Sequence, residues 1–140
     1  MNLIEKKSVV FTAQSKKNFF MRMLICKYVF EHGGIPLNPF NVFGYFLYEL
    51  VDRDLVRNGN NNLIIRSDEV WFFGEIADGC ISEIEYAMEL GKKIAFYKMG
   101  STYQSIEKCT IDELIFEDEV TVDTEKLKQK IKEYQYVSLW

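Results

Sequence analysis

Short, continuous apolar runs alternate with longer amphipathic stretches along this chain. The runs at 8–13, 69–73 and 93–97 are rich in β-branched and aromatic residues and predict buried strands. The stretch 35–40 carries two prolines, which predicts an extended segment at the edge of a sheet.

Helical spacing fills much of the remaining chain. We expect a first helix from a Ser15 cap to Gly33-Gly34 and a last helix with Thr124 as its cap. The polar run 57–62 is expected to end the second helix. For 63–65 a short helix and an isolated strand are both open, with the helix preferred. The expected ranges after the first helix are 43–56, 80–90 and 124–134.

Strands that alternate with helices imply a doubly wound parallel sheet of about four to five strands in a three-layer α/β/α sandwich, a Rossmann-like fold. No internal repeat or linker interrupts the pattern, so residues 1–140 are expected to form one domain. The segment 101–123 carries no decisive pattern, and a short helix and a strand both stay open within 110–122.

Charge and composition narrow the function. The chain has 140 residues and a formal net charge of −4, which argues against binding to a nucleic-acid polymer. No apolar stretch approaches the roughly 20 residues of a membrane span, and the N-terminus lacks a signal-peptide pattern. We expect a cytoplasmic protein. With one histidine and three scattered cysteines, we expect neither a metal site nor a cofactor. His32 fits the C-terminal end of a helix.

The loop 74–79 is the most informative of the strand ends, where parallel sheets bind ligands. It combines two glycines and two acids just before a helix. Glu85 and Glu89 on that helix are assigned to solvent, because like charges four residues apart repel each other. Glu83 lies on the margin of the apolar stripe, where partial burial would raise its pKa and the helix N-terminus would lower it. It fits either an ordinary helix-start glutamate or a carboxylate nucleophile.

Three motifs in this part of the chain resemble the nucleoside 2-deoxyribosyltransferase-like family. They are an aspartate before an apolar strand at 67–74, the spacing of Gly79, Glu83 and Ala87, and a Gly-Lys pair before a strand at 91–94. The segments 34–40 and 9–13 are similar to the second and first strand segments of the family, so the resemblance covers roughly residues 8–97.

The resemblance implies an oligomeric α/β enzyme that cleaves the N-glycosidic bond of 2′-deoxynucleosides. A glutamate attacks the anomeric carbon, and a free base or water completes the exchange. By position Glu83 is the implied nucleophile, with Asp78 or Glu75 orienting the sugar or exchanging protons. The implied ligand is a small nucleoside or nucleotide. The residues implied to bind it are Phe11, Gln14, Asn38, Phe40, Asn61, Gly74, Glu75 and Gly79.

Three positions depart from the family pattern. Asn61 and Ala77 stand where the transferases carry acids, with Asp78 one residue late. The first strand ends in Thr-Ala-Gln instead of a small-residue and proline turn. These departures affect proton handling and sugar positioning more than the fold.

Aromatic residues make up 15% of the chain, which requires a large core, an interface or a stacking site. We expect one group in the core: Phe19, Phe20, Phe30, Trp71, Phe72 and Phe96. A second group is expected to divide between stacking a base and sealing a homo-oligomer interface: Phe11, Phe40, Phe43, Tyr45, Tyr136 and Trp140.

Three functions are therefore open. The first is an N-glycosidic hydrolase or transferase with Glu83 as nucleophile. The second is a non-catalytic nucleotide-binding or sensing module on the same scaffold. The third is Mg²⁺-dependent phosphate chemistry around Glu75, Asp78 and Glu83.

Overall fold

A five-stranded sheet forms the centre of the protein. The computed structural model describes residues 1–44 and 49–138. The strand order is β2-β1-β3-β4-β5, and the first four strands are parallel. β5 pairs with β4 in the antiparallel direction, so the sheet is mixed. The strands span β1 Val9–Gln14, β2 Ile35–Leu37, β3 Glu69–Phe73, β4 Lys93–Lys98 and β5 Glu107–Lys108.

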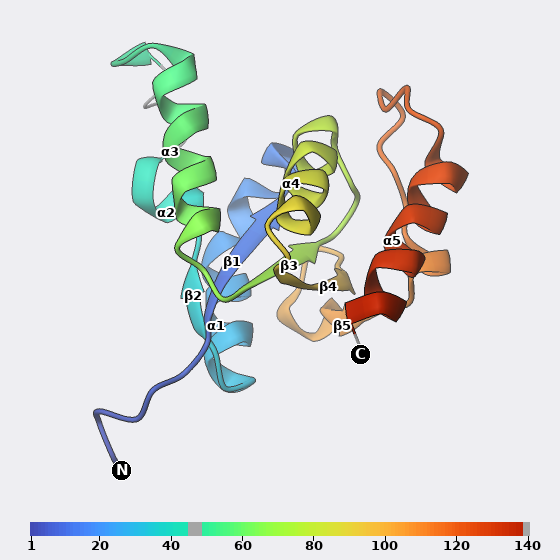
Figure 1. Ribbon diagram of the computed structural model, residues 1–140. Coiled ribbons are helices and arrows are strands. Elements are labelled where there is room, and N and C mark those ends of the chain that lie inside the picture. The colour runs from blue at the N-terminus through green and yellow to red at the C-terminus, as the bar shows by residue number, and fades with distance from the viewer. Residues whose placement is uncertain (45–48, 139–140) are drawn as a thin grey trace.

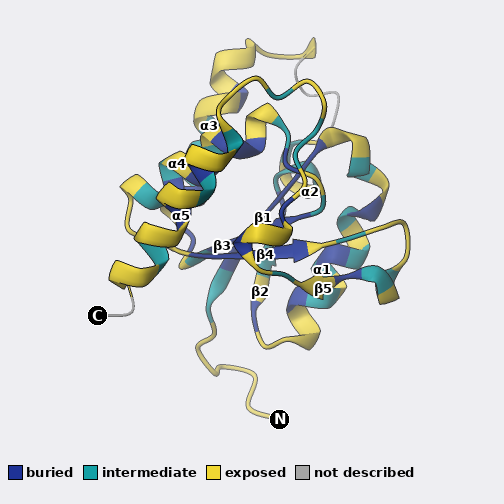
Figure 2. Cartoon of the chain, turned by 90° about the vertical axis from the view of Figure 1, so that its right-hand side faces the viewer, coloured by how far each residue is buried: buried dark blue, intermediate teal, exposed yellow. Residues whose placement is uncertain are grey.

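Helices cover both faces of this sheet (Figures 1 and 2). Helices α3, α4 and α5 lie on one face, and α1 lies on the other with the short 3-10 helices η1 and η3. This is the three-layer α/β/α architecture that the alternating pattern predicts. The helix bounds are η1 Lys16–Met21, α1 Arg22–Glu31, α2 Pro39–Phe43, α3 Arg53–Ile65, α4 Asp78–Glu89, η3 Tyr103–Ser105, η4 Ile111–Glu113 and α5 Thr124–Ser138.

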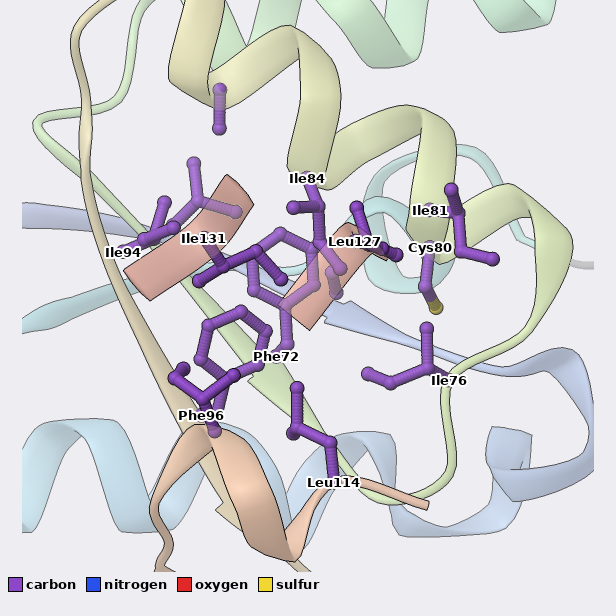
Figure 3. Close-up of a cluster of buried hydrophobic side chains, with 14 of the residues drawn as sticks. Phe72, Ile76, Cys80, Ile81, Ile84, Ile94, Phe96, Leu114, Leu127 and Ile131 are labelled. Carbon is purple, nitrogen blue, oxygen red and sulfur yellow. The ribbon is translucent and has the colours of Figure 1, made fainter. Parts of the chain in front are cut away.

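Alternate residues of each central strand fill two separate cores. Phe72 and Phe96 face α4 and α5, where their rings stack with centroids 5.1 Å apart (Figure 3). Trp71 and Tyr97 face α1. Successive side chains of a strand point to opposite faces, which is why one apolar run supplies both cores. The central position of β3, as predicted, places its carboxyl end beside that of β1.

The helix expected at 43–56 is wrong in its bounds. Residues 45–48 lie outside the described part of the chain, and α3 starts after an Asp52 cap and continues through the asparagine run to Ile65. Asparagine has a low helix propensity, but here packing prevails. Val56 and Ile64 are buried, and Gly59 lies so close to the Phe43 ring that a Cβ would come within 3.0 Å of it.

The edge segment 35–40 divides into strand and helix. β2 ends at Leu37, and the side chain of Asn38 accepts a hydrogen bond from the backbone of Phe40 and caps α2. Pro39 follows at the first helical position, where its missing N–H costs nothing. The expectation that Pro39 and Phe40 are extended is therefore wrong.

The tail, residues 110–138, packs against one face of the sheet and against the loop before α4. Within 110–122 only η4 is regular, and Phe116 forms an isolated parallel bridge with Ile76. In α5 Leu127 and Ile131 are buried, as its amphipathic stripe predicts. The cap is Asp123, which accepts a hydrogen bond from the backbone of Lys126, and not Thr124.

The aromatic residues are distributed differently from the prediction. Trp71, Phe72 and Phe96 are in the core as expected, but Phe20 and Phe30 are 57% and 59% exposed on the outer side of η1 and α1. Tyr45 and Trp140 lie outside the described residues. The homo-oligomer stays a prediction. None of the helices in 1–44 and 49–138 combines the length and apolar character needed to cross a membrane.

Candidate functional site

The carboxyl ends of β1 and β3 adjoin where the strand order reverses. The chain leaves β1 toward β2 on one side, and β3 lies on the other, so this is the switch point at which open α/β sheets bind ligands. Gly74 ends β3 with φ +81, and a Cβ there would come within 3.0 Å of the Asn18 amide. Glycine therefore allows both the turn and the close approach of η1.

Glu83 is the one strongly perturbed carboxyl group at this side of the described chain. It lies in the second turn of α4, and its carboxylate accepts a hydrogen bond of 3.0 Å from the Asn60 side chain of α3. Glu83 as a residue is half-buried, and desolvation of its carboxyl group raises the pKa to about 7, although the Asn60 hydrogen bond lowers it. The sequence pattern predicts Asn61 as a ligand-binding amide, and it gives no sign of Asn60.

A second carboxylate comes from the tail. Glu117 is only 9% exposed, accepts a hydrogen bond of 2.5 Å from the Ser15 hydroxyl and lies 3.8 Å from the Lys17 ammonium. Nothing in the irregular segment 101–123 marks this residue. It reaches the site because the backbone of 115–117 pairs with Ile76 in the loop before α4.

Cys80 is a buried thiol at the start of the helix that carries Glu83. It is 3% exposed at the start of α4, beside Ile76 (Figure 3). Burial, together with the negative charges of Glu83 and Glu117, raises the pKa of its thiol far above the usual range. The thiol is therefore protonated and too unreactive for a nucleophile.

The predicted ligands Gln14 and Asn38 form a closed amide cluster with Thr12. The Asn38 side-chain nitrogen donates to Thr12 Oγ1 and to Gln14 Oε1, both at 2.9 Å. The Gln14 amide donates in turn to the backbone carbonyl of Asn18. The three side chains are 7% exposed or less. Their polar groups tie β1 to β2 and η1, so we leave Gln14 and Asn38 out of the proposed site.

Three further predicted ligands, two aromatic residues and one amide, differ in where they lie. Phe11 is fully buried in the core under α4 and offers no face to a ligand, which corrects its assignment beside the base. Phe40 is half-buried in α2 with its ring edge-on to Phe19, 5.1 Å between centroids. Asn61 is half-buried on α3, next to the residue that contacts Glu83.

The loop residues lie at the exposed rim of the same edge. Glu75 and Asp78 are exposed. The Glu119 hydrogen bond and the charges of Glu117 and Glu75 raise the pKa of the Lys17 ammonium, which places Glu75 near that lysine. Gly79 is exposed in the first turn of α4, with open space where a Cβ would lie.

The described residues of this edge do not form a metal site. Within 1–44 and 49–138 no group of three or more His, Cys, Asp or Glu side chains is arranged to hold an ion. Glu75 and Asp78 do not converge with Glu83 on one point, so the structure gives no support to the Mg²⁺ hypothesis.

A pocket of about 410 Å³ lies away from this edge. It opens between β4, β5 and α5, and Ile94, Phe96, Lys108, Lys132 and Gln135 are among the residues that line it. It shares no residue with the environment of Glu83. None of the predicted site residues lines this pocket, so we keep the switch-point edge as the candidate site.

Comparisons with known proteins give the family of the chain but no activity for it. No curated protein matches. Among solved structures, the CMP N-glycosidase BcmB of Clostridium botulinum is similar at 17% sequence identity, with a TM-score of 0.47 over 90% of this chain and 99% of that one. A family model described as a domain of unknown function (DUF7768) matches residues 9–97, which include β1 to β3, most of β4 and the motif of Gly79 and Glu83. The chain therefore belongs to the DUF7768 domain family.

Proposed function

We propose that this protein cleaves the N-glycosidic bond of a nucleoside or nucleotide, with Glu83 as the nucleophile. The observation that carries the proposal is the desolvated Glu83 carboxyl group, held by Asn60 at the switch-point end of the sheet. The Gly79 and Glu83 spacing, which resembles the deoxyribosyltransferase-like pattern, lies in the first two turns of α4 and supports the proposal.

The reaction follows from what a poorly solvated carboxylate does beside an electron-poor carbon. The Glu83 oxygen forms a bond to the anomeric carbon, the carbon–nitrogen bond breaks, and the base leaves with the electron pair. Positive charge develops on the sugar in the transition state, and the carboxylate stabilises it more strongly than water would. Asn60 fixes the orientation of the attacking group. Water or a second base then displaces the sugar from the glutamyl ester.

The charges around the site favour an uncharged nucleoside over its 5′-phosphate. Glu75, Asp78, Glu117 and Glu119 surround this edge, and Lys17 already pairs with Glu119 at 2.9 Å and with Glu117. A phosphate would meet a net negative field. We therefore expect the free nucleoside to react faster than the matching monophosphate.

Base release from a panel of ribo- and deoxynucleosides, each beside its 5′-monophosphate, tests the proposal. Glu83→Gln should lower kcat/KM by at least about 10³-fold, because the nucleophile is lost. The matched control is Glu85→Gln, an exposed glutamate on the same helix, which should leave the rate within about twofold of the wild type, as expected for a solvated side chain. Full turnover by Glu83→Gln contradicts the mechanism.

The pH profile separates a nucleophile from a proton donor. A nucleophile must be ionised, so kcat/KM should rise with pH through about 7, the pKa of Glu83, and then level off. If Glu83 donated a proton instead, kcat/KM would fall as the pH rises through the same value.

A non-catalytic nucleotide-binding module is the second candidate. The observations that favour it are the neutral Asn61 and Ala77 at positions where the transferases carry acids. It predicts that a nucleoside or nucleotide raises the melting temperature while no base is released.

A further inference from the structure

We propose that Glu117 is a second catalytic carboxylate of this site, which removes the proton from the water or base that displaces the sugar from Glu83. The inference rests on the proposed function and extends it to the second half of the reaction. It is carried by the placement, burial and partners of Glu117.

The backbone of the tail fixes Glu117 against the loop that starts α4. The Ile76 N–H donates to the carbonyl of Ile115 at 2.8 Å, and the Glu117 N–H donates to the carbonyl of Ile76 at 2.9 Å. Ile76 is itself 1% exposed in the core under α4. Glu117 is therefore held on the same rigid support that positions the helix of Glu83.

Solvation distinguishes Glu117 from its neighbour Glu119. The Glu117 side chain is 9% exposed, and the Glu119 side chain is 63% exposed. Lys17 donates to Glu119 at 2.9 Å and lies farther from Glu117, at 3.8 Å. The closer contact of Lys17 to this segment is thus the one to Glu119. A desolvated carboxylate costs stability, and a simple tether between Lys17 and the tail does not need one.

The partners of Glu117 fix its carboxylate beside the end of β1. Ser15 donates to its Oε2 atom, and the Lys17 ammonium lies nearest its Oε1 atom. Ser15 directly follows β1, so this contact lies at the switch point. Ile76, to which the Glu117 backbone is hydrogen-bonded, packs beside Cys80 of α4 (Figure 3), so the segment that carries Glu117 lies against the start of the helix that carries Glu83.

In the second half of the reaction, water displaces the sugar from Glu83. A water oxygen forms a bond to the anomeric carbon of the sugar ester, and the bond from that carbon to the Glu83 oxygen breaks. Its electron pair returns to the Glu83 carboxylate. The proton of the water passes to Glu117, which later releases it to solvent. When a base accepts the sugar, its ring N–H proton takes the same route.

Pre-steady-state base release tests Glu117 separately from Glu83. Glu117→Gln keeps an acceptor for Ser15 but cannot take a proton. We expect a rapid burst of base followed by a steady rate that is about 10²–10⁴-fold below the wild type, the usual contribution of a general base. Azide, which carries no proton, should restore turnover in Glu117→Gln and form a glycosyl azide. Glu119→Gln, which removes the other partner of Lys17, should behave as the wild type.

The outcomes distinguish this inference from the proposed function. If wild-type protein releases no base from any nucleoside or nucleotide, both are overturned. If Glu83→Gln is inactive but Glu117→Gln turns over as the wild type, or loses burst and steady state alike without azide rescue, the inference alone is overturned. Should Glu117→Gln fail to fold, Glu117→Asp keeps the charge on a shorter side chain. A slowed second phase in that variant supports the inference, and an unchanged one overturns it.

Discussion

Two groups of polar side chains lie at the same end of the sheet, and they differ in how their hydrogen-bonding groups are used. In the amide cluster of Thr12, Gln14 and Asn38, neutral groups satisfy one another between β1 and β2. On the other side of β1, Glu83 and Glu117 are carboxylates in poorly solvated places, each with few donors. A closed neutral network stabilises a fold, whereas a desolvated charge costs stability and is typical of a reactive site.

The largest effect on stability is expected in the amide cluster. Asn38→Ala leaves Thr12 and Gln14 without their donor and removes the cap of α2, which together should cost about 2–4 kcal/mol of unfolding free energy. Urea unfolding measures the loss. The control Asn41→Ala, at an exposed position, should cost well under 1 kcal/mol. A loss that small for Asn38→Ala would show that the cluster is not structural.

At Glu83 we expect the substitution to raise the free energy of unfolding, whereas Asn38→Ala lowers it. Its pKa is about 7 in the folded chain and 4.5 when unperturbed, so the unfolded state loses its proton first as the pH rises. The wild-type unfolding free energy should therefore fall between these two values, by about 2–3 kcal/mol. Glu83→Gln cannot ionise, so it should be more stable than the wild type by a similar amount at about pH 8.

Urea unfolding of wild type, Glu83→Gln and Glu85→Gln at about pH 4 and pH 8 measures this difference. Glu85→Gln, at an exposed position, should not raise the free energy of unfolding at the higher pH. If Glu83→Gln destabilises the chain at the higher pH, the carboxylate is structural, and the contrast with the amide cluster disappears.

We expect Asn60 to set the pH at which Glu83 ionises, and with it the midpoint of the pH profile of kcat/KM. Asn60→Ala removes the donor that favours the ionised carboxylate, so the pKa of Glu83 should rise, by roughly one pH unit. The midpoint of kcat/KM, or of the stability change, should move upward accordingly. Asn61→Ala is the matched neighbour and should leave the midpoint in place. Equal shifts for both variants would contradict the assignment of Asn60.

The smallest effect on stability is expected at Gly79. Alanine fits the open space there and has the better helix propensity, so Gly79→Ala should stabilise α4 by up to about 1 kcal/mol. If a ligand approaches this backbone, the same change should raise KM. Thermal unfolding beside steady-state kinetics separates the two results. An unchanged KM would remove Gly79 from the proposed site.

The sequence predicts the sheet better than the site. β3 and β4 follow from apolar runs alone, because a strand covered on both faces must be apolar throughout. The course of α3 through 57–62 could not be predicted, since it depends on packing against Phe43 and on contact with α4. Motif spacing indicates Glu83 as the proposed nucleophile. It does not indicate Asn60 or Glu117, because their contacts bridge 23 and 102 residues of chain.

Peptide mass spectrometry of a reaction quenched with acid tests the central claim most directly. With a deoxynucleoside that supports base release, the peptide that carries Glu83 should gain the mass of the sugar, and Glu83→Gln should not. Base release without any adduct on this peptide, or with an adduct on another carboxylate, would contradict the assignment of Glu83 as the nucleophile.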